Sequence, residues 1–437
     1  MSDRPHDSSR NRIVIVGGGL AGLTCAKVLR DRGVENFILL ESSDRPGGRV
    51  RTDEVEGFHL DRGFQVLFAA YPMVKRHLDL DKLAVRPYSP GAILVRDGKG
   101  YVLSDPFRDV GSLWPSLTNP LATLGDKLRV LALRAKLAAM AIADIWQQPD
   151  GTTRAFLEAW GFSTDFIRQF FLPFYGGIFL DPKIATSALL FQFYFKMLSE
   201  GAILTPQYGL GAISDQLAAR CQSDRIRCHN RVVELIADET RVAGVKLDTG
   251  ETIEGDRVIL AADPPTVRRL LEPHIAIDPP VPTEPRSVTC LYFSSPEPLY
   301  RQKYLCLNAN IQPESVINNC VQLSNISPAL APAGQHLLSV TVLGLLEMSE
   351  EALRDRCLKE LQAWFPNFDC STLNYLKQYR IHLAQFDQPP GIRDRLPAAR
   401  TSISGLILAG DYTRQSSIDG AMASGEEAAA IACETAI

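Results

Sequence analysis

Several features are scarce or missing in this 437-residue sequence, and each absence excludes a class of protein. The net charge is only −4, because 46 Lys and Arg stand against 50 Asp and Glu, so no excess of basic residues favours nucleic acid as a partner. The nine cysteines include no CxxC pair, which argues against a zinc ribbon or a thioredoxin-like motif. We therefore predict no metal site, and we expect reduced, buried thiols.

Long apolar segments are also missing. The first residues are polar and offer no apolar core for a signal peptide, and no run of about 18 apolar residues occurs. The most apolar stretch, 128–146, carries cations in its first half and predicts an amphipathic or core helix, with a peripheral membrane contact as the alternative. We expect an intracellular protein, either cytoplasmic or peripheral on a membrane.

The composition that remains, 46% apolar and 22% charged residues, is typical of a folded globular protein. Its clearest local pattern is a strand–turn–helix–strand unit near the N-terminus. An apolar run over 12–16 predicts a buried strand, helical spacing follows over 20–32, and NFILLE at 36–41 predicts a second strand. This size and order are typical of a βαβ nucleotide-binding unit.

The turn of this unit has the G-x-G-x-x-G spacing. Gly17 permits the tight turn, Gly19 lets a pyrophosphate approach the backbone, and Gly22 lets helix and strand pack closely. The helix N-terminus offers free N–H groups and a positive dipole end to the phosphates. Glu41 ends the second strand, where a carboxylate can accept hydrogen bonds from ribose hydroxyls. The sequence therefore predicts a dinucleotide site that includes Leu20 and Ala21 at the helix start.

A second motif extends the first and indicates which dinucleotide is bound. After Glu41 the chain reads SSDRPGGRVRT, which gives E-x-x-x-R-x-G-G-R-x-x-T with Arg45, Gly48 and Arg49. This pattern resembles the superfamily of flavin-containing amine oxidases, phytoene desaturases and protoporphyrinogen oxidases. The resemblance implies FAD as cofactor, with the paired glycines and Arg49 beside the pyrophosphate and flavin, where a guanidinium suits two phosphates.

The third motif, LILAGDYTRQSSIDGAMASGEEAAAIA, lies near the C-terminus. In the same superfamily this segment returns to the flavin, so the resemblance implies that Asp411 hydrogen-bonds the ribityl chain. It also implies that the following helix points at the N1–C2 edge of the flavin, where its N-terminus stabilises negative charge. The remaining cofactor residues implied by the resemblance are Gly63, Val233 at the adenine, Gly410, Gly420, Ala421 and Met422.

The predicted fold class is α/β, with a discontinuous Rossmann-like FAD-binding domain and a mixed α+β substrate domain that includes a helical subdomain. We assign the FAD-binding domain to 12–70, 205–265 and 400–437, after a disordered tail over 1–11. Residues 71–204 are expected to be mostly helical and to face substrate or membrane. Residues 266–399 complete the substrate domain.

Two stretches favour the carotenoid side of the superfamily. DRGFQVLFAAYP at 61–72 is similar to a plant-type phytoene desaturase segment, with Gln65 where those enzymes carry histidine, and AGDYTRQ at 409–415 is similar to the desaturase version. The link from 415 to Gly420 is shorter than in those desaturases, which favours a related enzyme with another substrate. Amine oxidases need an aromatic residue in 415–418, and this chain has none.

We therefore predict a desaturase- or dehydrogenase-like enzyme that removes hydride from an apolar, polyene or isoprenoid-type substrate. Hydride passes to flavin N5, and oxygen or a quinone reoxidises the flavin. No residue stands out as the base, and the pocket candidates are Gln65, Tyr175, Tyr208 and His382, although most rings of the aromatic region suit core packing equally well. The alternatives are a flavin-containing amine oxidase and a non-catalytic lipid-binding escort protein of related fold.

Overall fold

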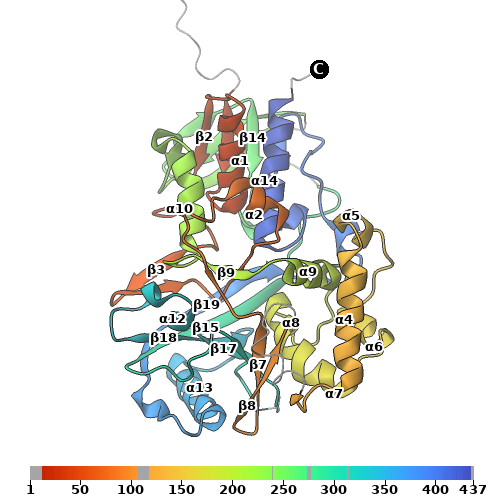
Figure 1. Ribbon diagram of the computed structural model, residues 1–437. Coiled ribbons are helices and arrows are strands. Elements are labelled where there is room, and N and C mark those ends of the chain that lie inside the picture. The colour runs from red at the N-terminus through yellow and green to blue at the C-terminus, as the bar shows by residue number, and fades with distance from the viewer. Residues whose placement is uncertain are drawn as a thin grey trace, which may run out of the picture.

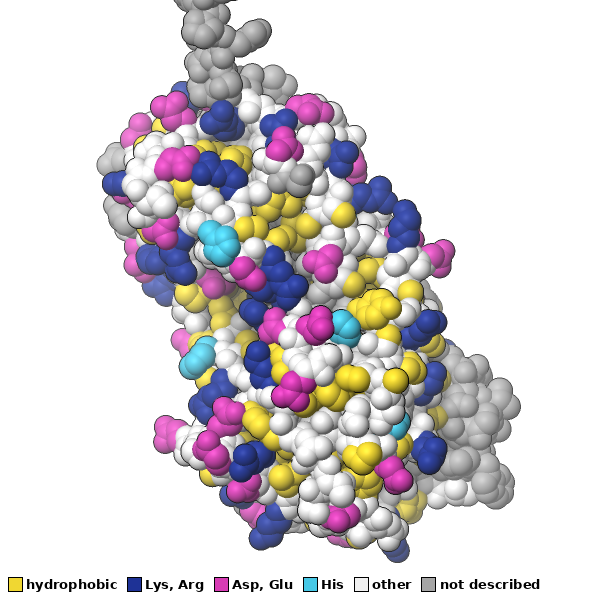
Figure 2. Space-filling model, turned by 90° about the vertical axis from the view of Figure 1, so that its left-hand side faces the viewer, with side chains coloured by type: hydrophobic (Ala, Val, Ile, Leu, Met, Phe, Trp, Pro, Cys, Tyr) yellow, Lys and Arg dark blue, Asp and Glu magenta, His cyan; other side chains and the backbone are white. Residues whose placement is uncertain are grey.

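A computed structural model describes residues 12–105, 118–238, 240–272, 277–310, 312 and 314–434. The expected tail over 1–11 lies outside the described residues. The molecule has an upper and a lower part (Figure 1). On the face shown in Figure 2, cationic and anionic side chains are interspersed with small apolar groups, as the small net charge leads one to expect. No helix within the described ranges is long and apolar enough to cross a membrane.

The upper part is built on a five-stranded, all-parallel sheet. Its order is β10 (Ile226–Arg227), β2 (Phe37–Leu40), β1 (Ile13–Val16), β14 (Arg257–Leu260) and β20 (Leu406–Leu408). Strands β1 and β14 are almost wholly buried, which explains their unbroken apolar sequences. Three distant segments of the chain thus share one sheet. The predicted α/β class with a Rossmann-like parallel sheet is confirmed.

Helices α1 (Leu20–Asp31) and α14 (Ile418–Cys433) pack side by side on this sheet (Figure 1). A Cβ built on Gly425 of α14 would overlap the carbonyl oxygen of Ala21 in α1, so the two backbones are in direct contact. Helix α10 (Gly211–Arg220) also packs on α1. A small antiparallel sheet, β11 (Val232–Ala237), β12 (Val242–Leu247) and β13 (Thr252–Glu254), completes the upper part.

The lower part is centred on a seven-stranded sheet. Its order is β19 (Asn374–Phe386), β15 (Pro285–Ser295), β18 (His336–Leu343), β17 (Asn319–Gln322), β16 (Leu305–Asn308), β7 (Gly91–Arg96) and β8 (Lys99–Ser104). Helix α13 (Glu350–Trp364) covers part of one face (Figure 1). Two small sheets lie near the junction, β3 (Thr52–Val55) with β4 (Phe58–Asp61), and β5 (Leu67–Phe68) with β9 (Ile203–Thr205) and β6 (Arg86–Pro87).

The segment 71–204, expected to be mostly helical, contains both helices and strands. Its helices include α2 (Pro72–His77), α4 (Leu124–Ala138), α5 (Ile142–Ile145), α6 (Thr153–Ala159), α8 (Leu172–Phe179) and α9 (Ala188–Glu200). However, 91–104 forms the β7–β8 hairpin. Asp97 and Gly98, with φ of 51° and 71°, make its two-residue turn, and this Asp-Gly pair is the signal that sequence reasoning overlooked.

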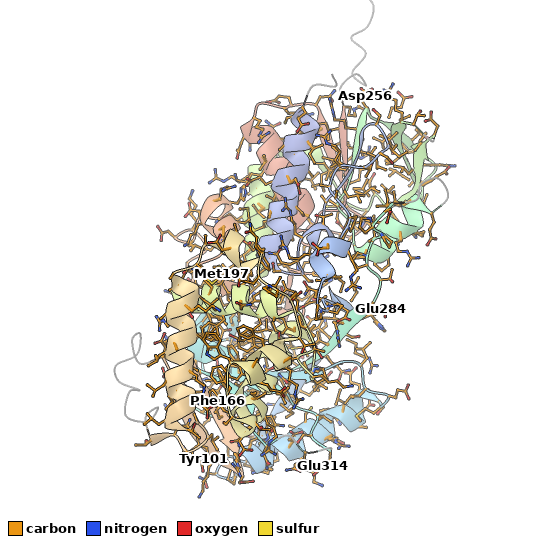
Figure 3. All side chains as sticks on the ribbon, turned by 90° about the vertical axis from the view of Figure 1, so that its right-hand side faces the viewer. Tyr101, Phe166, Met197, Asp256, Glu284 and Glu314 are labelled. Atoms are coloured by element: carbon orange, nitrogen blue, oxygen red, sulfur yellow. The ribbon has the colours of Figure 1, made fainter. Side chains whose placement is uncertain are left out.

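Aromatic side chains fill the space between these helices. Figure 3 shows Phe166 inside this region and Met197 of α9 near the junction with the upper part. Phe166 and Phe171 are fully buried and meet edge to face, with ring centroids 5.3 Å apart. Such ring pairs rigidify a core beyond their burial alone. This aromatic cluster therefore forms a packed wall of the lower part.

Candidate cofactor site

The carboxyl ends of the parallel strands face the junction between the two parts. Asp256, which directly precedes β14, lies at the far end of the upper part, and Glu284 lies at the junction (Figure 3). Loops that follow β1, β2, β14 and β20 therefore meet at the junction. Ligands of open α/β sheets bind at this edge.

The glycine loop after β1 leaves its backbone accessible. Gly17 has φ of 107°, and a Cβ there would lie 2.7 Å from the carbonyl oxygen of Ala261. A Cβ at Gly19 would meet nothing within 4 Å, and Gly19 caps α1 without any side-chain hydrogen bond. Gly48 faces it, since a Cβ at 48 would lie 3.2 Å from the Gly19 Cα. Two glycine loops thus border an open space at the N-terminus of α1, as a pyrophosphate requires.

Glu41 lies at the end of β2 and is 8% exposed. Its Oε2 accepts a hydrogen bond of 2.7 Å from the Gly18 N–H, and its Oε1 accepts bonds from the N–H (2.8 Å) and hydroxyl (2.7 Å) of Ser43. A carboxylate fixed from both sides in this way is oriented to accept further hydrogen bonds. Arg45 pairs with Asp53, with Nη2 and Oδ1 3.5 Å apart.

Val233 is brought to the same side through the segment before it. The N–H of Asn230 donates to the Glu41 carbonyl oxygen at 2.8 Å. The register of β11 against β12 then shifts, so that Val232 faces Leu247 and the next paired residue is Glu234. Val233 is the extra residue of this bulge and is 39% exposed. Val233 is therefore partly accessible in the segment that follows the contact with Glu41.

Arg49 and Asp411 meet although 362 positions separate them. The Arg49 Nη2 donates to Asp411 Oδ1 at 2.7 Å, and its Nη1 donates to the Ala384 carbonyl oxygen at 3.0 Å. Burial acts to lower the pKa of Arg49, but the Asp411 carboxylate outweighs it and the pKa is raised, so Arg49 stays charged. Asp411 is 3% exposed, and its Oδ2 accepts a bond of 2.8 Å from the Ser416 hydroxyl.

The C-terminal motif places its helix beside the glycine loop. The Ser417 hydroxyl caps α14 by accepting from the Gly420 N–H at 2.8 Å, and Met422 is fully buried. The Gly410 N–H donates to the Ser424 hydroxyl at 2.9 Å, which ties the strand end to the helix. The N-termini of α1 and α14 thus lie at one edge of the sheet and both contribute positive dipole ends.

The four pocket candidates are placed differently. Gln65 donates through Nε2 to the Arg49 carbonyl oxygen at 2.9 Å, and neighbouring Gly63 packs against Ile381 of β19. Tyr175 is 2% exposed within the aromatic cluster, and burial raises its pKa well above the ordinary value. Tyr208 is 55% exposed and meets His59 edge to face, with centroids 5.4 Å apart.

His382, the fourth candidate, is exposed on β19. Sequence reasoning did not single out Ser416, Gln388 or Tyr194, which the fold brings to Asp411 and its loop. Serine, glutamine and tyrosine in apolar surroundings carry no motif of their own, so only the long-range contacts reveal them.

The residues of the site fit a dinucleotide with a flavin. Two glycine loops and an uncapped helix N-terminus suit phosphates, a buried carboxylate at the β2 end suits ribose hydroxyls, and Arg49 supplies a cation. A glycine loop, an acidic strand end and a returning C-terminal helix on one parallel sheet define a dinucleotide-binding protein of the Rossmann type.

Comparison with known proteins specifies the class further. The chain belongs to the family of flavin containing amine oxidoreductases. The sequence pattern of this family matches residues 20–433. It is therefore an FAD-dependent oxidoreductase. The predicted membership of the superfamily is confirmed.

Individual relatives come from both sides of this superfamily. A 15-cis-phytoene desaturase of an Oncidium hybrid is 24% identical over 95% of this chain and 76% of its own length. The zeta-carotene desaturase of Synechocystis is 24% identical over 96% of both chains. An L-amino-acid oxidase of Siganus canaliculatus is 46% identical, but over only 14% of this chain and 11% of its own.

Solved structures share the fold. A putative protoporphyrinogen oxidase of Exiguobacterium has a TM-score of 0.73 at 19% identity, with 98% of this chain and 100% of that chain covered. A putrescine oxidase with bound putrescine has a TM-score of 0.70 at 18% identity, with 96% and 98% covered. At these identities the likeness shows a common fold, and it carries no conclusion about the substrate.

Proposed function

We propose that this protein oxidises an apolar, polyene or isoprenoid-type substrate in a desaturase-like reaction. The observation that carries the proposal is the contact of the aromatic cluster with the cofactor site. Tyr194 of α9 is 4% exposed, packs edge to face on Phe179, and donates from its hydroxyl to the Ser416 carbonyl oxygen at 3.0 Å. An apolar wall thus borders the residues that we assign to the flavin.

Two of the relatives that support this substrate class match the chain over nearly its whole length, and a third matches more than half of it. They include the phytoene and zeta-carotene desaturases and a hydroxyneurosporene desaturase of Rubrivivax gelatinosus, 25% identical over 58% of this chain. The L-amino-acid oxidase of Siganus canaliculatus matches over only 61 residues. An apolar substrate gains from burial against rings, whereas a charged amine would need a polar anchor.

Each cofactor residue has a proposed task in this scheme. Glu41 accepts hydrogen bonds from the adenosine ribose, the bulge at Val233 contacts adenine, and Arg49 lies beside the phosphates and the flavin. Asp411 orients the ribityl chain, and the N-terminus of α14 faces the N1–C2 edge. FAD, when bound, supplies the redox chemistry by accepting a hydride at N5 from an activated C–H bond.

The protein groups supply binding and orientation. The aromatic wall excludes water from the substrate, and the N-terminus of α14, with its dipole, stabilises negative charge near Gly420. We assign no residue as the acceptor of the proton that leaves the neighbouring carbon. Oxygen or a quinone is the proposed electron acceptor.

The test is anaerobic bleaching of the bound flavin in its visible absorption band. One sample receives a detergent-solubilised polyene, a second a panel of primary amines, and a third detergent alone. Bleaching by the polyene and not by detergent supports the proposal. Bleaching only by an amine would favour the amine oxidase alternative. Purified protein that binds no added FAD would count against the cofactor assignment and for the escort alternative.

We further propose that α4 provides a peripheral membrane contact through which such a substrate enters. Leu124 and Leu128 on one face of α4 are 68% and 57% exposed, an uncommon position for large apolar side chains. The helix lies at the outer edge of the lower part (Figure 3). Cosedimentation with vesicles of neutral and of anionic phospholipid tests this. The double variant L124S/L128S should lose binding, and undiminished binding would refute the contact.

A further inference from the structure

Ser416 makes three hydrogen bonds, one within its own loop and two to other parts of the chain. It is 5% exposed. Its hydroxyl donates to Asp411 Oδ2 at 2.8 Å, its N–H donates to Gln388 Oε1 at 2.9 Å, and its carbonyl oxygen accepts from the Tyr194 hydroxyl at 3.0 Å. Both its backbone groups and its side chain are thereby fixed.

The partners of Ser416 are themselves anchored in the helical region. Gln388 is 3% exposed, and its carbonyl oxygen accepts from the Ser187 N–H at 2.9 Å. Ser187 is the N-cap residue of α9, the helix that carries Tyr194, and its hydroxyl donates to the Asp150 carboxylate at 2.9 Å. Asp150 also accepts from the Gly391 N–H at 2.8 Å. One continuous set of hydrogen bonds thus runs from the lower part to the cofactor site.

This arrangement restricts the Asp411 carboxylate. An ionised carboxylate is an acceptor with two oxygens, and here Oδ1 is held by Arg49 and Oδ2 by Ser416. Its remaining lone pairs therefore point in fixed directions. Without the Ser416 hydroxyl, Oδ2 of this nearly buried carboxylate would lose a hydrogen-bond donor, and the group could rotate about its side-chain bonds.

We propose that Ser416 is a positioning residue for the flavin, which sets the direction of the Asp411 carboxylate toward the ribityl hydroxyls. Tyr194 and Gln388 act through Ser416 and couple the packing of α9 to the affinity for FAD. The inference rests on the cofactor placement proposed above and is independent of the substrate.

The experiment measures the FAD dissociation constant of apoprotein by flavin fluorescence, together with the midpoint potential of the bound flavin. Loss of a hydrogen bond to a charged group should weaken FAD binding about tenfold in S416A. S416A should also shift the midpoint potential. In Y194F we expect FAD binding to weaken about threefold and the potential to shift in the same direction as in S416A. Tyr194 holds the Ser416 carbonyl oxygen and so affects Asp411 only by fixing where the Ser416 hydroxyl lies. S416A/Y194F should therefore bind FAD no more weakly than S416A.

A buried serine elsewhere provides the matched control. Ser295, at the end of β15, is fully buried and donates to the Glu297 carbonyl oxygen at 2.6 Å. S295A should lower the melting temperature of the apoprotein without changing FAD affinity or potential. If S416A behaves as S295A does, or if the two losses in S416A/Y194F simply multiply, the positioning role is refuted.

D411N separates this inference from the cofactor placement on which it rests. If D411N leaves FAD affinity unchanged, the placement of Asp411 at the ribityl chain is wrong. If D411N weakens FAD binding while S416A does not, the placement stands and the role of Ser416 is wrong. Neither readout involves a substrate, so the bleaching experiment fails or succeeds independently.

Discussion

Replacing Gly425 with alanine should separate helices α1 and α14 and weaken cofactor binding. A Cβ at 425 would overlap the carbonyl oxygen of Ala21 and lie 3.0 Å from its carbonyl carbon and 3.1 Å from the backbone nitrogen of Cys25. All three are backbone atoms of α1, so no side chain can rotate away. The helices must therefore move apart by about 1 Å, which in a packed core costs about 1–3 kcal/mol.

The expected loss follows from that range. For a domain of roughly 150–250 residues, 1 kcal/mol shifts the melting temperature by about 2–4 °C, so G425A should melt about 2–12 °C lower. Both helix N-termini lie at the cofactor site, and their displacement should also raise the FAD dissociation constant. Thermal unfolding by circular dichroism and flavin fluorescence measure the two effects.

The control is Gly151→Ala, because a Cβ at 151 would meet nothing within 4 Å. It should leave the melting temperature and FAD affinity close to those of the original protein. A G425A protein that matches this control in both measurements would refute the direct backbone contact between the two helices.

Three other predictions concern single side chains. Glu41→Gln should weaken FAD binding about 10- to 100-fold by removing a charged acceptor, whereas exposed Glu54→Gln should not, as fluorescence titration would show. Burial raises the pKa of Asp61 to about 7, above its unfolded value, so the native state binds more protons and the free energy of unfolding falls as pH rises from about 4 to 7. D61N should abolish this pH dependence in urea unfolding, and identical pH profiles for D61N and the original protein would contradict the prediction. Lys196→Met should lower the free energy of unfolding by about 1–3 kcal/mol, because the Lys196 ammonium donates to the Leu137 carbonyl oxygen at 2.8 Å, near the end of α4. An unchanged midpoint of urea denaturation would show that this hydrogen bond contributes nothing to stability.

Local sequence signals were enough to predict the elements whose backbone conformation depends on neighbouring residues. The run of apolar residues in β1, the glycines of the following turn and the helical spacing of α1 each constrain only a few neighbouring residues. The predicted helix 20–32 and strand 36–41 agree with α1 and β2 to within a residue or so at each end. The β7–β8 hairpin also had such a signal, the Asp97–Gly98 turn, but it was not recognised among the helical patterns of 71–204.

The sequence by itself determined the class of protein, because the dinucleotide motifs combine backbone requirements with residue types at fixed spacing. Only the tertiary structure decided which side chains meet. Arg49 contacts Asp411 because β20 pairs with β14 and α14 lies against α1. Ser416 contacts Tyr194 because α9 reaches the same junction as the loop before α14. Such contacts join residues hundreds of positions apart through the order of strands in a sheet and the packing of helices on it, and no local periodicity encodes that order.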